Sequence, residues 1–224
     1  VSKLISIGEM ISVLQTQSMH AGSEPDVTVR DYVPGDAIKN ISWKTSAREN
    51  KLKVRNRIAE EKQGIALFGD TKRYYSRMEE YLPLENKMLE IMVSLGIYLA
   101  EQNMPFTAYY SQGKMISKRV NGVREFNEYY ENISGVVYSD TEDVSGLMRE
   151  LMAKGAFSDC KVAFGILHEM NQEIMEMTEQ LSRSSIPVVL YVKTKKKYED
   201  YIKLNNERRN IITVPVDAEL EGRL

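Results

Sequence analysis

Three polar residues follow two of the most apolar stretches of this chain, and their types suit acid–base chemistry. Asp70 comes directly after the apolar run 65–69, and His168 and Glu169 follow the apolar run 162–167. If both runs are parallel strands, their carboxyl ends meet at the sheet edge where open α/β sheets bind ligands. A carboxylate and an imidazole placed there could act as general acid and base. Since the only other histidine is His20, one hypothesis is a hydrolase that uses Asp70, His168 and Glu169.

Other catalytic signatures are missing from the sequence, which favours a non-enzymatic role. The Gly-Asp-Thr-Lys-Arg run at 69–73 lacks the Gly-Lys-Ser/Thr ending of a phosphate-binding loop, and no Gly-x-Ser-x-Gly elbow occurs. A structural reading also exists for the candidates above. Asp70 could cap a turn after its strand, and His168 could be a buried histidine whose hydrogen bonds are satisfied.

Composition excludes several classes of protein. The 224 residues carry a net charge of −2, so no global field favours nucleic acid or an anionic membrane. A single cysteine, Cys160, rules out an internal disulfide and favours a reducing compartment. No apolar run is long enough to cross a bilayer. A basic strand face formed by Lys51, Lys53, Arg55 and Arg57 gives a third hypothesis, a nucleic-acid surface, but without interleaved aromatic residues we expect no such partner.

Hydrophobic periodicity predicts alternating strands and helices. Apolar or alternating runs predict strands at 52–58, 65–69, 106–110, 114–120, 162–167, 187–192 and 211–216. Helical spacing predicts helices from Pro83 and Glu85 to Leu99, and over 123–133, 144–152 and 174–181, with methionines filling their buried faces. We also expect Asp36 to cap a short helix through Ile38 and Ile41, and a helical turn over 43–49. The order predicts a doubly wound α/β fold: a mostly parallel sheet, helices on both faces, and residues 114–120 as an antiparallel edge strand.

A dense motif precedes this region. Its residues are Arg30, Tyr32, Gly35, Asp36, Ile41, Trp43, Lys44, Ser46, Ala47 and Arg48. This Arg-x-Tyr-x-x-Gly-Asp run, followed by Ile-x-Trp-Lys and Ser-Ala-Arg, resembles the signature of the domain of unknown function 58 family. The bland alternative is structural: Tyr32, Ile41 and Trp43 could staple the segment to the main sheet, with the charged residues satisfying one another.

The resemblance implies an architecture and a setting. It implies an N-terminal extension at 1–63 and a von Willebrand factor A-like domain at 64–224. Similar proteins carry upstream membrane helices, so we expect this chain to be the soluble part of a membrane-anchored protein at the cytoplasmic face of the membrane. Similar proteins are associated with MoxR-type AAA ATPases in assembling or maturing other complexes, which makes such an ATPase the expected partner.

The resemblance also implies a metal-ion-dependent adhesion site, which we expect to be degenerate. The pattern requires Asp-x-Ser-x-Ser after the first strand, and Asp70 and Thr71 are followed by Lys72 and Tyr74 at the serine positions. A lysine repels Mg²⁺, and a tyrosine is too large to replace a serine. Thr141 is a loose match to the distal threonine, and His168-Glu169 stand where an aspartate is expected. We therefore expect no bound Mg²⁺, with the Lys72 ammonium supplying the positive charge instead. The alternatives are a metal-dependent ligand-binding domain or the hydrolase above.

Overall fold

The computed structural model describes residues 5–6, 29–33, 41–55, 64–194 and 210–221. The chain forms two compact units, one of Val13–Lys62 and one of Val1–Ser12 together with Gln63–Leu224. The short strand β1 (Ile5–Ser6) groups with the larger unit because it pairs in parallel with β10 (Leu220–Glu221). The domain boundary expected between residues 63 and 64 stays a prediction.

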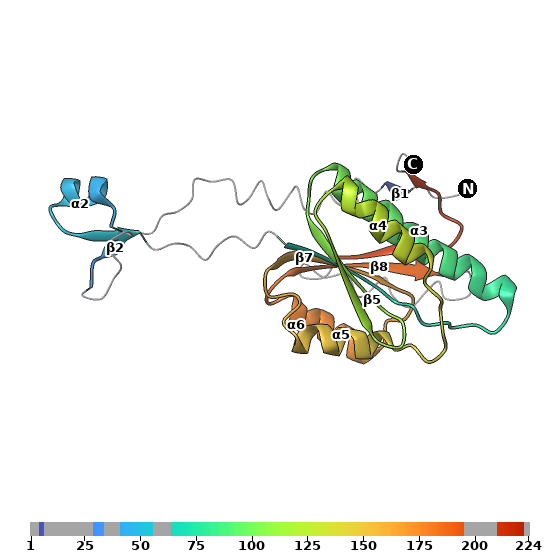
Figure 1. Cartoon of the computed structure of the whole chain (residues 1–224). Coiled ribbons are helices and arrows are strands. Elements are labelled where there is room, and N and C mark those ends of the chain that lie inside the picture. Colours follow the sequence, from blue (N-terminus) through green and yellow to red (C-terminus); the bar gives the residue numbers. More distant parts are fainter. Residues whose placement is uncertain (1–4, 7–28, 34–40, 56–63, 195–209, 222–224) are drawn as a thin grey trace. The chain divides into compact units, whose positions relative to one another are not determined.

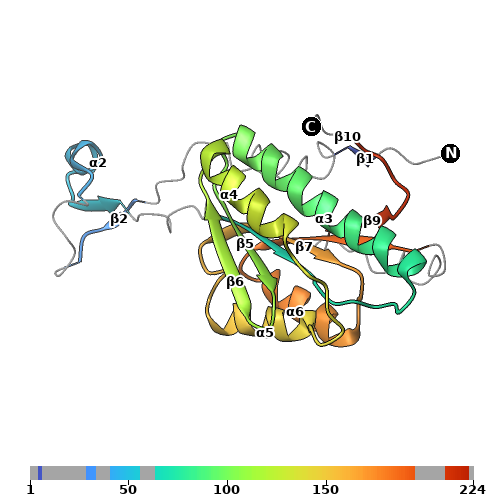
Figure 2. The same ribbon diagram turned by 45° about the vertical axis from the view of Figure 1, so that its right-hand side comes forward.

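The larger unit is built on a six-stranded sheet of order β6-β5-β4-β7-β8-β9. Its strands are β4 (Gly64–Gly69), β5 (Phe106–Ser111), β6 (Met115–Val120), β7 (Cys160–Leu167), β8 (Ile186–Lys193) and β9 (Asn210–Pro215). Neighbouring strands are parallel except β5 and β6, which form the antiparallel pair at one edge (Figure 2). The predicted edge strand at 114–120 is therefore confirmed.

Helices cover both faces of this sheet (Figure 1). On one face lie α3 (Met78–Glu101) and α4 (Val123–Ser134), and on the other lie α5 (Val144–Ala153) and α6 (Gln172–Leu181). Apolar side chains of β4, β7 and β8 are buried against them, as expected for parallel strands covered on both sides. The methionines at 88, 92, 148 and 177 are buried in these layers, and Met152 is partly buried. The predicted doubly wound α/β class is confirmed.

Helix α3 differs from the prediction at its start. It begins at Met78, five residues before Pro83, which lies inside the helix. A proline in the second turn removes one backbone hydrogen bond. The helix is 24 residues long, and the carboxylates of Glu79 and Glu80 in its first turn favour that terminus electrostatically, so it tolerates the loss.

The described part of the smaller unit contains a two-stranded antiparallel ribbon and a short helix. Strand β2 (Val29–Asp31) pairs with β3 (Lys53–Arg55), and α2 spans Trp43–Glu49, which confirms the predicted helical turn. Of the predicted short helix, residues 36–40 lie outside the described residues. Ile41 is not helical and forms a β-bridge to Val54 instead. Val54 is buried in the ribbon, whereas Leu52, which precedes β3, is 46% exposed.

Candidate functional site

The strands β4 and β7 lie side by side at the centre of the sheet, and the chain leaves them in opposite directions. From β4 it runs to β5 on one side, whereas β7 continues to β8 on the other. This is the topological switch point at which doubly wound sheets open a crevice. The backbone N–H of Asp70 donates to the carbonyl of Ile166 at 3.0 Å, which aligns the two strand ends. Asp70 and His168 therefore come to one edge, as the sequence predicts.

The Asp70 carboxylate is buried and accepts hydrogen bonds from its own loop and from the backbone of His168. Its side chain is 1% exposed. Oδ1 accepts the backbone N–H of Lys72 at 2.9 Å, and Oδ2 accepts the Tyr74 hydroxyl at 2.5 Å. Burial raises the pKa of this carboxyl from 3.8 to about 6, although these hydrogen bonds oppose the shift. We expected Tyr74 to be too large for a serine position, but its hydroxyl reaches Oδ2 of Asp70.

The Lys72 ammonium places its positive charge beside the Glu169 carboxylate at the site. Its ammonium lies 3.8 Å from Glu169 Oε2 and 5.3 Å from the centre of the Tyr74 ring. The Lys72 and Glu169 side chains are each about one-third exposed (34% and 38%), so they form the solvent-facing rim above the buried Asp70. The positive charge thus pairs with Glu169, and the neutral Tyr74 closes Asp70.

The imidazole of His168 is held on both sides. It is 1% exposed, its Nδ1 lies 2.7 Å from the carbonyl oxygen of Val192, and its Nε2 lies 3.0 Å from the hydroxyl of Tyr75. Because a carbonyl can only accept, Nδ1 carries a proton, and in the neutral imidazole Nε2 accepts from Tyr75. The Tyr74 ring packs edge-on against the imidazole, with ring centres 4.8 Å apart. Both nitrogens are engaged, so His168 has no ring nitrogen left for a substrate.

Threonines expected at the site have structural partners. Thr71 is buried and donates to the carbonyl of Ser111 at 2.8 Å, which ties the loop to the end of β5. Thr141 is exposed, and its hydroxyl lies 2.8 Å from that of Ser139. Ser139 in turn forms a parallel bridge with Lys72. The loop before α5 therefore lies beside the site, but Thr141 contacts its own loop.

Sequence reasoning missed a half-buried ion pair between Arg73 in the loop after β4 and Glu85 on α3. The Arg73 guanidinium donates twice to Glu85, through Nε at 2.7 Å and a terminal nitrogen at 3.1 Å, and stacks 4.1 Å over the Tyr81 ring. Glu85 is 7% exposed. Glu85 lies three residues before Met88 and seven before Met92, which places it on the apolar face of the helix. An acid on such a face requires a partner, so this spacing could have predicted the ion pair. Nearby, the Tyr138 hydroxyl is buried with no hydrogen-bond partner among the described residues.

The motif residues of the smaller unit are partly structural. The Ser46 hydroxyl accepts the backbone N–H of Lys53 at 2.9 Å, which fastens α2 to β3. Trp43 is 64% exposed, and the stapling of this segment to the main sheet stays a prediction. Ile41 is buried and Tyr32 half-buried, whereas Lys44, Ala47 and Arg48 are exposed. Gly35 and Asp36 lie outside the described residues, and Arg30 is described only by its place in β2.

The basic strand face is partly neutralised. The Lys53 ammonium lies 2.7 Å from Asp31 and 2.9 Å from Glu49. These two carboxylates leave Lys53 little free positive charge for a phosphate backbone. Arg57 lies outside the described residues.

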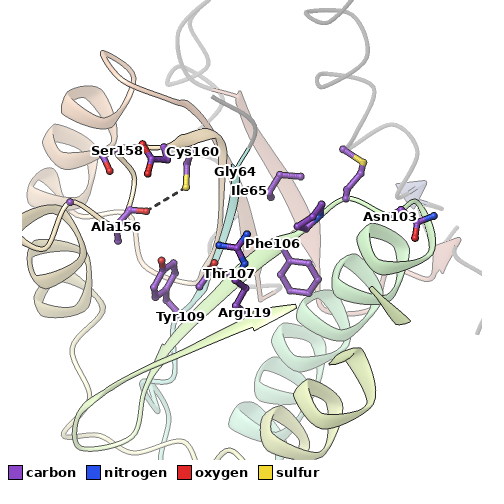
Figure 3. Close-up of a pocket in the computed structure, with 14 residues that line it drawn as sticks. Gly64, Ile65, Asn103, Phe106, Thr107, Tyr109, Arg119, Ala156, Ser158 and Cys160 are labelled. Carbon is purple, nitrogen blue, oxygen red and sulfur yellow. Dashed lines mark hydrogen bonds between the residues drawn. The ribbon is translucent and has the colours of Figure 1, made fainter. Parts of the chain in front are cut away.

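Among the described residues of the larger unit, pockets lie at both the carboxyl and the amino edge of the sheet. One of about 430 Å³ lies at the carboxyl edge and shares Tyr75 with the site. The other, of about 490 Å³, lies at the amino edge, between the starts of β4 and β5 and the loop before β7, and Figure 3 shows Arg119, Tyr109 and Cys160 among its lining residues. The helices α3 and α5 both run toward that edge and end there, so their carbonyl ends disfavour an anion. The carboxyl edge is the better candidate, because it holds the switch point at which doubly wound sheets bind ligands.

Comparison of the sequence with known families gives one match. Residues 28–104 match the family described as "Protein of unknown function DUF58". The resemblance to DUF58 is confirmed. The DUF58 match begins just before β2 and runs through Asp70 and Tyr74 to the end of α3, so it takes in both the motif and the first half of the site. No curated protein matches the sequence.

Solved structures similar to this DUF58-like chain are von Willebrand factor A domains. A von Willebrand factor type A protein from Catenulispora acidiphila matches 69% of this chain with a TM-score of 0.51 and 7% identity, and this chain spans only 39% of that protein. The SpRpn10 VWA domain matches 68% of this chain and 88% of its own length, at a TM-score of 0.45 and 5% identity. Proximal thread matrix protein 1 from the mussel byssus, with a zinc-occupied MIDAS motif, matches 69% of this chain and 44% of its own length, at a TM-score of 0.44 and 10% identity. The first likeness confirms the von Willebrand factor A-like fold and carries no function.

The strand ends hold Asp70 but lack the two serine hydroxyls of the adhesion-site pattern. A hard cation requires several oxygen ligands, and here the serine positions hold Lys72 and Tyr74. Over the described ranges, no group of three or more His, Cys, Asp or Glu side chains could hold a metal. Separately, none of the helices in the described ranges is long and apolar enough to cross a membrane.

Proposed function

We propose that this chain is a non-enzymatic protein-interaction module whose docking surface is the carboxyl edge of the main sheet. The observation that carries the proposal is the closure of Asp70: one carboxylate oxygen accepts the Tyr74 hydroxyl at 2.5 Å and the other accepts the Lys72 N–H at 2.9 Å. A partner then meets the Lys72–Glu169 rim instead of a bound cation. On this proposal the adhesion site is degenerate, and docking needs no metal.

The same contacts speak against the hydrolase hypothesis. A general base needs a free lone pair within hydrogen-bond reach of the substrate proton. The Nε2 lone pair of His168 is occupied by Tyr75, and Asp70 is buried. Glu169 is paired with Lys72 across 3.8 Å. The three residues lie together, but each is already hydrogen-bonded, buried or ion-paired. None of them is therefore poised to act as a nucleophile.

The family resemblance supplies the candidate partner, a MoxR-type AAA ATPase, and the setting, a membrane-anchored protein at the cytoplasmic face of the membrane. The proposed role is to help such an ATPase assemble or mature other complexes. The partner and the setting come from the family resemblance. The geometry itself supports a docking edge of mixed charge.

Binding to the MoxR-type ATPase of the same organism tests this proposal. Biolayer interferometry with the immobilised chain would be run with the ATPase free, with ADP and with a non-hydrolysable ATP analogue. We expect binding in at least one state, and Glu169→Ala to weaken it about tenfold because the rim loses its carboxylate. Asp159→Ala is the matched control, since that exposed carboxylate lies at the opposite sheet edge.

The effect of metal on binding is measured with the nucleotide-free ATPase. The proposal expects equal affinity in EDTA and in Mg²⁺. Absence of binding in every nucleotide state would remove the ATPase as partner. Binding that is abolished by EDTA would contradict the proposal that docking needs no metal.

A further inference from the structure

Strand β6 is an edge strand of the main sheet, and its outer side is open. It stands at the end of the strand order and pairs only with β5 among the described residues (Figure 2). The pairing keeps one register over all six residues of β6, and the strand contains no proline. Because neither a bulge nor a proline interrupts this edge, it has the geometry that accepts one more strand.

The hairpin register shows which backbone groups of β6 point outward. At the turn, the N–H of Gln112 donates to the carbonyl of Lys114 at 3.0 Å, so these two residues form a hydrogen-bonded pair. Hydrogen-bonded and non-hydrogen-bonded pairs alternate along an antiparallel ladder. Met115, Ser117 and Arg119 therefore direct their N–H and C=O groups away from β5. Within the described ranges, these outward groups have no hydrogen-bond partner.

The side chains along β6 leave positive charge at this edge. The Lys118 ammonium is ion-paired with Glu128 of α4. By contrast, Nε of Arg119 donates to the neutral side-chain oxygen of Asn121 at 3.0 Å, and Lys114 at the turn is exposed. Neither Lys114 nor Arg119 has a carboxylate within ion-pair distance in the described part of the chain.

These charges select among possible occupants of the edge. A second copy that paired through its own β6 would bring the cations of two strands together, and like charges on neighbouring strands are destabilising. Cationic side chains on an open edge protect a sheet against such self-pairing. An acidic segment gains instead, because a residue opposite Arg119 on an added strand has its Cβ about 5 Å from that of Arg119.

We propose that β6 takes a short extended segment of a partner protein as a seventh strand of the six-stranded sheet, with an acidic side chain of that segment paired to Arg119. The outward N–H and C=O groups of Met115, Ser117 and Arg119 hydrogen-bond the backbone of the segment. Its side chains supply specificity: an acid beside Arg119 and, four positions away on the same face, an apolar residue beside the half-buried Met115. This surface runs along the side of the sheet and is separate from the docking surface at the strand ends.

Peptide selection tests this without knowledge of the natural partner. Phage-displayed random dodecapeptides are depleted on Ser117→Pro and then enriched on the wild-type 224-residue chain. Proline removes the outward N–H of Ser117, and at an outward position it leaves the ladder to β5 intact. We expect enriched peptides that contain an acidic residue and bind Ser117→Pro at least about tenfold more weakly than wild type in fluorescence anisotropy. Ser117→Ala, which keeps the N–H, is the matched control and should bind them like wild type.

The charge contribution is measured with the same peptides. Arg119→Ser should weaken their binding severalfold, because the backbone pairing remains and the ion pair is lost. Arg183→Ser is the matched control, since that exposed arginine lies just before β8, three strands away from β6 in the sheet order. Equal losses in the two arginine variants would overturn the proposal, because that result indicates non-specific charge attraction.

Amide hydrogen exchange of the wild type keeps the test valid if Ser117→Pro fails to fold, in which case depletion uses Arg119→Ser. Bound peptide should slow exchange of the Ser117 and Arg119 amides about tenfold or more, whereas the Ile116 and Lys118 amides already face β5. Unchanged exchange at Ser117 and Arg119 would overturn the proposal. So would enriched peptides without acidic residues, or no enrichment after depletion. These outcomes do not depend on the ATPase, so failure here and failure of the proposed function are separate results.

Discussion

The variant Asp70→Asn is expected to remove a pH dependence of stability that the wild-type chain has between pH 4 and 7. Burial raises the pKa of Asp70 from 3.8 to about 6 in the folded protein. Between these values the unfolded chain has lost the proton and the folded chain keeps it. Stability that is fully present below pH 3.8 is therefore lost as the pH rises through 6. A shift of this size corresponds to about 3 kcal/mol.

Urea unfolding at a series of pH values and constant ionic strength measures this effect. The unfolding free energy of the wild type minus that of Asp70→Asn should fall by about 2–3 kcal/mol from pH 4 to pH 7. Asp159→Asn is the matched control, because that carboxylate is exposed, and its difference should stay flat. A difference that rises with pH would mean that the folded protein favours the ionised Asp70, contrary to the account.

The second large effect is expected for Arg73→Met, which leaves Glu85 buried without its cation. Breaking a buried pair from one side costs about 3–5 kcal/mol when both groups are buried. Because Arg73 is 35% exposed and Glu85 is 9% exposed by side chain, we expect a loss of about 2–4 kcal/mol in unfolding free energy. The double variant Arg73→Met with Glu85→Leu should recover most of it, since no buried charge remains.

Arg149→Met is the matched control for this prediction. Arg149 also contacts two carboxylates, Asp143 and Glu173, but all three side chains are about half exposed. Its loss should cost less than about 1 kcal/mol in the same urea titration. Equal costs for the two arginines, or additive costs in the Arg73–Glu85 double variant, would mean that the buried pair contributes no coupling.

The fold could be predicted from the sequence because buried strands require a recognisable pattern of apolar residues. Strands covered on both faces must be apolar throughout, so β4, β7 and β8 were recognisable as unbroken runs. Once these strands are parallel, their carboxyl ends coincide, and the positions of Asp70 and His168 follow. The start of α3 was less clear, because Pro83 is a strong local signal and the 24-residue helix outweighs it.

The contacts within the site depend on register and loop packing, which local patterns do not encode. His168 and Tyr75 are 93 residues apart, and their hydrogen bond requires the loop after β4 to fold over the end of β7. The placement of Lys72 beside Ser139 likewise comes from two loops meeting. Tyr74 illustrates the limit of reasoning by residue size: a tyrosine cannot replace a serine hydroxyl in place, yet a bend of the loop brings its hydroxyl to Asp70.

Isothermal titration of the chelator-treated chain with Mn²⁺ tests the central claim most directly, because the claim is that Tyr74 and the Lys72 backbone occupy the Asp70 oxygens. The account predicts no heat of stoichiometric binding at millimolar Mn²⁺. The variant Lys72→Ser with Tyr74→Ser, which supplies the missing oxygens, serves as the comparison and should gain measurable binding. One Mn²⁺ per wild-type chain, lost in Asp70→Asn, would contradict the account.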